Sequence, residues 1–209
     1  MSKIYLHIVV IYCFFLMVNV TLSKSTGDNI IIDSDLTFNE AIKGTQAPKE
    51  VIDSLVLINV EYYSFDNKLH RGQLVIHKNL KNDIQQIFNL IKERKFPIAK
   101  VIPIVQYNWS DDSSMADNNT SSFNYRKVAN KNKLSNHSFG TAIDINPLQN
   151  PAVYSDGSIS PKGAKYNPHV KGTITEDCPL TKEFKKLGWT WGGDWNSLKD
   201  YQHFEKTKN

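Results

Sequence analysis

The chain of 209 residues carries 25 lysines and arginines against 21 aspartates and glutamates, a formal net charge of +4. This mild excess excludes the strongly basic surface expected of a nucleic-acid-binding protein, so we expect no nucleic-acid partner. The two cysteines are Cys13 and Cys178. Because Cys13 lies in an apolar leader, a mature chain would keep one cysteine and could form no internal disulfide.

The first 23 residues have the composition of a secretory signal peptide. Residues 4–22 contain no Asp, Glu, Lys or Arg, and Lys3 stands just before them. Thr21 and Ser23 then supply small side chains where a signal peptidase reads the chain. The sequence predicts cleavage after residues 1–23, export to the periplasm or the cell exterior, and no stable membrane span afterwards. An uncleaved anchor is the alternative, because the apolar run approaches the roughly 20 residues that cross a bilayer.

The elements that follow begin with a polar segment and a short strand pair. Residues 24–54 are polar and mixed, and we predict an N-terminal arm there, ahead of a single larger domain over residues 55–209. Residues 55–63 are β-branched and aromatic, which predicts a strand, and residues 73–77 predict a shorter second one. An amphipathic helix is predicted before Pro97. Its apolar positions, at helical spacing, are Leu80, Ile84, Ile87, Phe88 and Ile91.

The second half of the chain alternates long polar connections with short elements. In chain order we predict a strand over 99–107, a long loop over 108–136, a strand over 141–146, a long connection over 147–178 and a helix over 180–187. A tryptophan-rich segment follows. This order predicts an α+β fold, in which a small antiparallel sheet is flanked by helices and connected by long loops.

Two histidines and an aspartate stand in aromatic, glycine-rich surroundings. His137 and Asp144 are separated by the small residues Gly140 and Ala142, which let the backbone pass close to a site, and His203 lies near the C-terminus. Two imidazoles and a carboxylate suit Zn²⁺, and three protein ligands leave a fourth position for water. The pattern therefore predicts one catalytic zinc ion per chain. The alternative is a surface histidine and an aspartate that caps a turn.

Two motifs carry a family resemblance. The first is Ser-x-His-x-x-Gly-x-Ala-x-Asp over residues 135–144, and the second is Asp-x-x-His-Phe-Glu over residues 200–205. Together they resemble the zinc D-alanyl-D-alanine carboxypeptidase and L-alanyl-D-glutamate endopeptidase family of bacterial and phage cell-wall peptidases. The resemblance covers roughly residues 70–205. It implies that both histidines and the aspartate bind zinc, and that peptidoglycan peptides are the substrate.

Peptide hydrolysis also needs a group that takes a proton from water and returns one to the leaving amine. In the family that the chain resembles, this group is a carboxylate three residues before the last histidine, which implies Asp200. A three-residue spacing puts two side chains on opposite faces of a regular strand. We therefore predict that Asp200 lies in a turn just before the strand that carries His203. Asp194 and Glu205 are the alternative bases.

The resemblance also assigns residues to the substrate. Arg126 resembles the arginine that faces the scissile carbonyl, where a guanidinium would stabilise the developing oxyanion. The alternative is an exposed loop arginine. Ser135 matches the serine before the first zinc ligand, and it either contacts the substrate or caps a turn. Trp189, Trp191 and Trp195 are predicted to pack in the core rather than to form a substrate platform.

The sequence thus predicts an exported, monomeric zinc peptidase that cuts a peptide bond in peptidoglycan stem peptides. Carboxypeptidase and endopeptidase activities both stay open. The alternative is a non-catalytic, zinc-stabilised cell-wall-binding module of the same fold, against which Asp200 and Arg126 argue because a structural zinc site needs neither. A glycosylation sequon at Asn136 would place a glycan beside His137, which favours a bacterial source without such glycosylation.

Overall fold

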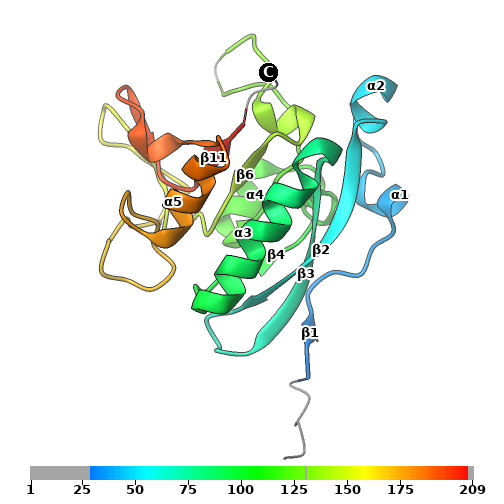
Figure 1. Cartoon of the computed structure of the whole chain (residues 1–209). Coiled ribbons are helices and arrows are strands. Elements are labelled where there is room, and N and C mark those ends of the chain that lie inside the picture. The colour runs from blue at the N-terminus through cyan, green and yellow to red at the C-terminus, as the bar shows by residue number, and fades with distance from the viewer. Residues whose placement is uncertain (1–28, 130, 207–209) are drawn as a thin grey trace, which may run out of the picture.

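A computed structural model of the chain describes residues 29–129 and 131–206, whose arrangement is traced in Figure 1. The predicted signal peptide lies outside the described residues. Within the described part the chain mixes five α-helices with several small sheets, so the α+β class is confirmed. None of the helices described is long and apolar enough to cross a membrane.

The longest elements form a hairpin. Strands β2 (Leu55–Tyr63) and β3 (Leu69–His77) pair antiparallel along their whole length, and β1 (Ile31–Ile32) adds to β3 in parallel. The predicted strand over 55–63 is confirmed. The second strand begins at Leu69, earlier than the predicted residue 73. Residues 69–72 have no apolar run that would predict a strand, but their pairing with β2 holds them in the sheet.

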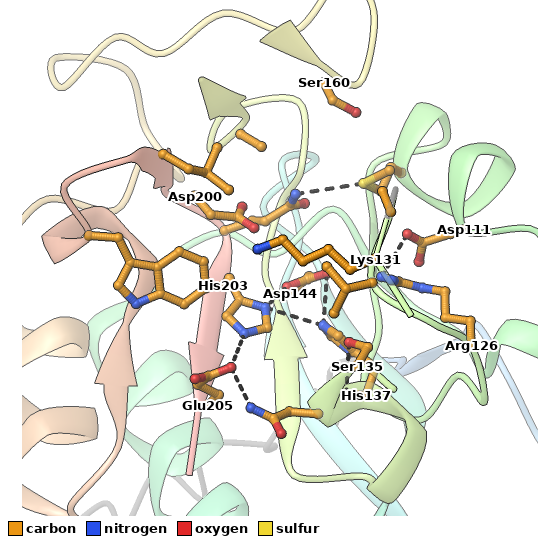
Figure 2. A pocket seen from close by; sticks show the side chains of 18 of the residues that line it. Asp111, Arg126, Lys131, Ser135, His137, Asp144, Ser160, Asp200, His203 and Glu205 are labelled. Carbon is orange, nitrogen blue, oxygen red and sulfur yellow. Dashed lines mark hydrogen bonds and ion pairs between the residues drawn. The ribbon is translucent and has the colours of Figure 1, made fainter. Parts of the chain in front are cut away.

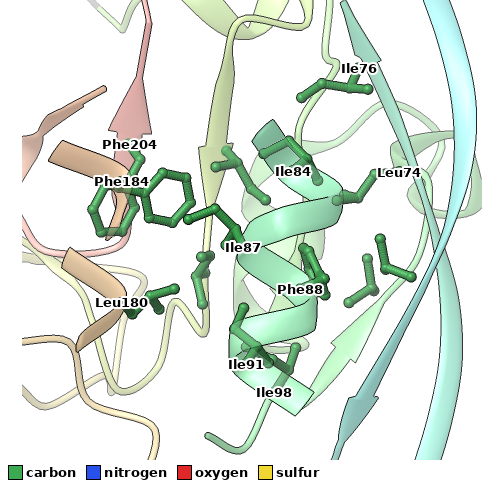
Figure 3. Close-up of a cluster of buried hydrophobic side chains, with 14 of the residues drawn as sticks. Leu74, Ile76, Ile84, Ile87, Phe88, Ile91, Ile98, Leu180, Phe184 and Phe204 are labelled. Carbon is green, nitrogen blue, oxygen red and sulfur yellow. The ribbon is translucent and has the colours of Figure 1, made fainter. Parts of the chain in front are cut away.

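Helix α3 (Lys81–Arg94) lies across one face of this hairpin and beside α5 (Pro179–Lys186) (Figure 1). Both predicted helices are confirmed. Helix α3 ends at Arg94, and its C-cap residue Lys95 adopts a left-handed conformation with φ 49° shortly before Pro97. Figure 3 shows the core between these elements. Its buried members include Leu74, Ile76, Ile84, Ile87, Phe88, Ile91, Ile98, Leu180, Phe184 and Phe204.

A second sheet, with the order β6–β11–β9, lies on the other side of this core. Strands β6 (Ala142–Asp144), β11 (His203–Glu205) and β9 (Thr190–Trp191) pair antiparallel. Side chains alternate along each strand, so Ile143 and Phe204 enter the core while Asp144 and His203 share the opposite face. The Phe204 ring stacks on Phe184 of α5 at 3.9 Å between centroids, which anchors the sheet.

The third sheet runs in the order β10–β7–β8. Strand β7 (Ala152–Tyr154) pairs with both β8 (Ile159–Ser160) and β10 (Leu198–Asp200). The predicted connection over 147–178 therefore contains a short hairpin. Three 3-10 helices lie between these elements: η1 (Lys78–Leu80) between β3 and α3, η3 (Asn136–Phe139) before β6, and η4 (Gly192–Asp194) between β9 and β10.

The strand predicted over residues 99–107 is wrong beyond its first residues. Only β4 (Lys100–Val101) is extended, and the chain then turns into a 3-10 helix, η2 (Ile104–Tyr107), with Pro103 at its N-cap. Proline has no backbone N–H to donate to a ladder, and its fixed φ suits the entry to a helical turn.

The loop predicted over residues 108–136 is also wrong in part, because it holds α4 (Asp111–Ala116) and β5 (Asn119–Thr120). The Ser110 side chain caps α4 by accepting from the Ser113 backbone N–H at 3.2 Å, and aspartates fill the first turn. Strand β5 pairs in parallel with β4.

Residues 29–54 contact the hairpin through polar and apolar side chains. Helices α1 (Phe38–Ala41) and α2 (Lys49–Ile52) belong to a small apolar cluster that includes Val75 of β3. Gln73 of β3 accepts from both the Ser34 hydroxyl and the Leu36 backbone N–H at 2.7 Å. The proposed division into an arm over 24–54 and a domain over 55–209 stays a prediction.

Candidate functional site: a His–Asp–His cluster in a cleft

Three short elements bring the predicted ligands together. His137 lies on η3, Asp144 ends β6, and His203 begins β11 directly opposite Asp144 in the antiparallel register. Gly140 ends η3 with φ 64°, and a Cβ there would lie 2.7 Å from the backbone nitrogen of His77. Glycine is therefore required where the chain turns from the first histidine into the strand that carries the aspartate.

The ligand atoms of the three side chains converge on one point (Figure 2). His137 Nε2 lies 3.2 Å from His203 Nδ1 and 3.2 Å from Asp144 Oδ2, and His203 Nδ1 lies 2.9 Å from Asp144 Oδ1. All three residues are buried, with exposed fractions of 3%, 7% and 5% for His137, His203 and Asp144. Ligands at about 2.1 Å in a tetrahedral arrangement around one zinc ion would be about 3.4 Å apart. The observed spacing is close to that value.

The outer nitrogen of each imidazole shows which tautomer the site holds. His137 Nδ1 lies 2.6 Å from the Ser122 carbonyl oxygen, and His203 Nε2 lies 2.9 Å from Glu205 Oε2. Both partners can only accept, so both of these nitrogens carry hydrogen. The inner nitrogens of the neutral rings then present lone pairs to each other and to the Asp144 carboxylate. Such a set of acceptors needs a cation or an added proton between them.

Without a metal, that proton resides on the histidine of β11. Burial lowers the pKa of His203, but hydrogen bonds with Asp144 and Glu205 outweigh it and raise the pKa to about 10. Burial alone would raise the pKa of Asp144, whereas its contacts with His137 and His203 hold it well below its usual range. Without a metal the site is therefore an ion pair, and a metal ion that bound there would have to displace a proton.

Asp200 lies at the last position of β10 rather than in a turn, so this detail of the prediction is wrong. Its strand pairs with β7, and the turn at Tyr201 and Gln202 then reverses the chain into β11. Because the chain reverses between the two residues, Asp200 and His203 line the same cleft despite their three-residue spacing. Burial of the carboxyl group raises the pKa of Asp200 to about 6. Its Oδ1 atom has no hydrogen-bond partner among the described residues.

The two alternative bases are placed differently. Asp194 forms an ion pair with Lys185 at 2.8 Å and does not line the cleft. Glu205 does line the cleft, but its Oε2 atom accepts from His203 and from the Asn136 side chain. Glu205 and Asp144 therefore lie on opposite sides of the His203 ring, Glu205 at Nε2 and Asp144 at Nδ1.

A cleft of about 490 Å³ opens over this cluster. Its walls come from α4, residues 126–129 and 131–136, the β7–β8 hairpin and residues 195–205 (Figure 2). Trp189 and Trp191 are buried in the core as predicted, whereas Trp195 lines the cleft with its ring 5.3 Å from that of His203. The prediction of a core position is therefore wrong for Trp195, whose ring covers one side of the site.

Both residues that the resemblance assigned to substrate lie at the cleft. Arg126 lines it, and its Nη2 atom forms an ion pair with Asp111 Oδ2 at 2.7 Å. This ion pair attaches the guanidinium to α4, so Arg126 is not a free surface side chain. Ser135 caps η3 by accepting from the His137 backbone N–H at 3.3 Å, and it also lines the cleft.

Several features of the site have no signal in the sequence. The Ser122 carbonyl that orients the first histidine is a backbone group, which any residue could supply. The hydrogen bond from Asn136 to Glu205 joins residues that lie on different motifs. The hairpin wall around Tyr154 falls in a segment predicted as a loop.

Comparison with known proteins finds a family match for the C-terminal part of the chain. Residues 129–206 match a family described as D-alanyl-D-alanine carboxypeptidase, which confirms the resemblance carried by the two motifs. The match supports a peptidase whose substrates, at the level of the family, are peptidoglycan peptides. The matched segment contains the three converging side chains and Asp200, while Arg126 precedes it. No curated protein and no solved structure matches the chain.

Proposed function

We propose that the chain is an exported zinc metallopeptidase that hydrolyses a peptide bond in peptidoglycan stem peptides, of the D-Ala-D-Ala carboxypeptidase or L-Ala-D-Glu endopeptidase type. The observation that carries the proposal is the convergence of three buried lone-pair donors, from His137, Asp144 and His203, at the floor of an open cleft. The family match over residues 129–206 supports the substrate class. Export rests on the predicted leader.

The donor set fits zinc, since two imidazole nitrogens and one carboxylate leave a fourth position on the side of the cleft. A zinc ion held there would polarise the scissile carbonyl and lower the pKa of a water molecule. The role of the protein is to orient the three ligands before the metal arrives. His137 and His203 are each fixed through the outer nitrogen, so neither ring has to turn when the metal binds.

Asp200 is the proposed proton carrier. Its carboxyl group has a pKa near 6, close to neutral pH, so it can accept a proton from the attacking water and return it to the leaving amine. Arg126 is the proposed partner of the developing oxyanion, because a guanidinium already held by Asp111 costs little reorganisation when charge appears. Ser135 is proposed to contact the substrate while it caps η3.

A non-catalytic zinc module is the competing function, and the openness of the site argues against it. A structural zinc ion has four protein ligands and is closed to solvent. Here, among the described residues, the group that could hold a metal contains three side chains, and all three line the cleft.

Digestion of purified muropeptides, analysed by mass spectrometry with and without a chelator, tests the proposal. We expect one stem-peptide bond to be cut, cleavage to stop when the metal is removed, and zinc to restore it. The mass of the products identifies the bond. A protein that binds one zinc ion yet leaves every muropeptide intact would support the binding module instead.

The assignment of the base has its own variant pair. Asp200→Ala should abolish turnover while one zinc ion per chain stays bound, because Asp200 has no hydrogen bond to a zinc ligand. Asp194→Ala is the matched control, since Asp194 is paired with Lys185 outside the cleft, and it should keep near-normal turnover. The reverse result would transfer the role to Asp194.

A further inference from the structure

The two histidines of the cluster are held by chemically different partners. His137 donates from Nδ1 to a backbone carbonyl, that of Ser122, at 2.6 Å. His203 donates from Nε2 to the Glu205 carboxylate at 2.9 Å. The first contact survives any substitution at position 122, because every residue supplies a carbonyl. The second depends on one side chain.

Glu205 is itself held in place. It lies two residues after His203 on β11, so both side chains leave the strand on the same face. The Asn136 side chain donates to the same Glu205 oxygen, Oε2, at 2.6 Å. Asn136 directly precedes His137 on η3. The hydrogen bond therefore links the segment that carries one histidine to the strand that carries the other.

We propose that Glu205 is the positioning residue of the metal centre, and that Asn136 secures it. Glu205 fixes the tautomer and the ring orientation of His203, so that Nδ1 faces Asp144 and His137 before a metal binds. This inference rests on the proposed zinc-dependent function. Carboxylate partners of ligand histidines raise the basicity of the ring, and their loss typically costs about 10- to 100-fold in metal affinity.

A catalytic role for Glu205 makes a different prediction. A general base acts on turnover and leaves metal affinity unchanged, whereas a positioning residue acts on metal affinity and on the ligand field. The geometry favours positioning, because Glu205 contacts the nitrogen of His203 that points away from Asp144.

The test measures zinc affinity by chelator competition, and the ligand field from the visible absorption of the Co²⁺-substituted protein. We expect Glu205→Ala to weaken zinc binding about 10- to 100-fold and to change the Co²⁺ bands. Glu205→Gln should weaken zinc binding less, because its amide oxygen still accepts a hydrogen bond from His203 although the negative charge is gone. Asn136→Ala should lose least, since it leaves the carboxylate on the ring. Thermal unfolding of each metal-free variant shows whether it is folded.

Glu61→Ala is the matched control. Glu61 is half-buried and forms a single ion pair with Lys92, at 2.8 Å, in a different sheet, so its loss removes the same charge without touching the cluster. It should keep the zinc affinity and the Co²⁺ spectrum of the unaltered protein.

The outcomes separate this inference from the proposed function. Zinc affinity within twofold of the unaltered protein in both Glu205 variants would overturn the positioning role. A loss of equal size in Glu205→Gln and Glu205→Ala, with an unchanged Co²⁺ spectrum, would also overturn it. If the unaltered protein binds no zinc, the proposed function itself fails. Should Glu205→Ala not fold, the graded losses in Glu205→Gln and Asn136→Ala decide the question.

Discussion

Removing the metal should make the stability of the protein depend on pH in a way that the zinc-loaded protein does not share. The pKa of His203 is about 10 in the metal-free fold, against 6.5 for a histidine in an unfolded chain. Because the folded value is the higher one, the stabilisation from the proton is complete below pH 6.5. It is lost as the pH rises through 10. A zinc-bound His203 carries no such proton.

The size of the effect follows from the proton count. Between pH 7 and 9 the folded metal-free protein holds one proton on His203 that the unfolded chain has released, so the free energy of unfolding falls by about 1.4 kcal/mol per pH unit. For a domain of this size that corresponds to a decrease in Tm of about 3–6 °C per pH unit. Asp144 and Asp200 add no slope in this window, because the pKa of Asp144 is lowered and that of Asp200 is near 6.

Scanning calorimetry of the metal-free and the zinc-loaded protein from pH 7 to 9 measures this slope, and the difference between the two cancels groups remote from the site. Long-range ¹H–¹⁵N correlation NMR of the metal-free protein, with His203→Asn for assignment, reports the ring directly. We expect an imidazolium at pH 8. Two results together would refute the argument that the cluster shares one proton held on His203. These are a neutral His203 ring that titrates near pH 6.5, and Tm values of the metal-free and zinc-loaded protein that change in parallel with pH.

Three substitutions, and a fourth that serves as a control, test other parts of the site and its scaffold. Arg126→Lys should lower kcat about 100-fold if the guanidinium stabilises the oxyanion, and near-normal kcat/KM would remove it from the catalytic residues. Ser135→Ala should lower the free energy of unfolding by about 1 kcal/mol through loss of the η3 cap, and an added rise in KM would indicate substrate contact; an unchanged Tm would show that the cap contributes little. Gly140→Ala should lower the unfolding free energy by about 2 kcal/mol or more, measured by urea titration, because its Cβ would meet backbone at 2.7 Å in a left-handed conformation. Gly157→Ala is the control, because Gly157 has φ 83° and no atom lies within 4 Å of the added Cβ, so only the conformational strain remains. It should lower the unfolding free energy less than Gly140→Ala does, and equal decreases would contradict the packing argument.

Local pattern was enough where a single face of one element decides the outcome. The apolar positions of α3 recur at helical spacing, and the helix forms with those residues in the core. The strand over 55–63 was predictable for a similar reason, since β-branched and aromatic residues fit a half-buried sheet. The strand predicted over 99–107 failed because composition alone could not show that Pro103 starts a helical turn there.

The sequence by itself determined which side chains could bind a metal. The two motifs contain imidazole and carboxylate groups, and the type of a residue is read directly from the sequence. Only the tertiary structure decided how they act together. The register of β6 against β11 places Asp144 opposite His203, and the Asn136–Glu205 hydrogen bond joins segments 69 residues apart. Such pairings arise from packing between distant segments, and a backbone carbonyl such as that of Ser122 has no residue type to reveal it. For this reason the three side chains that converge could be predicted, whereas the groups that orient them could not.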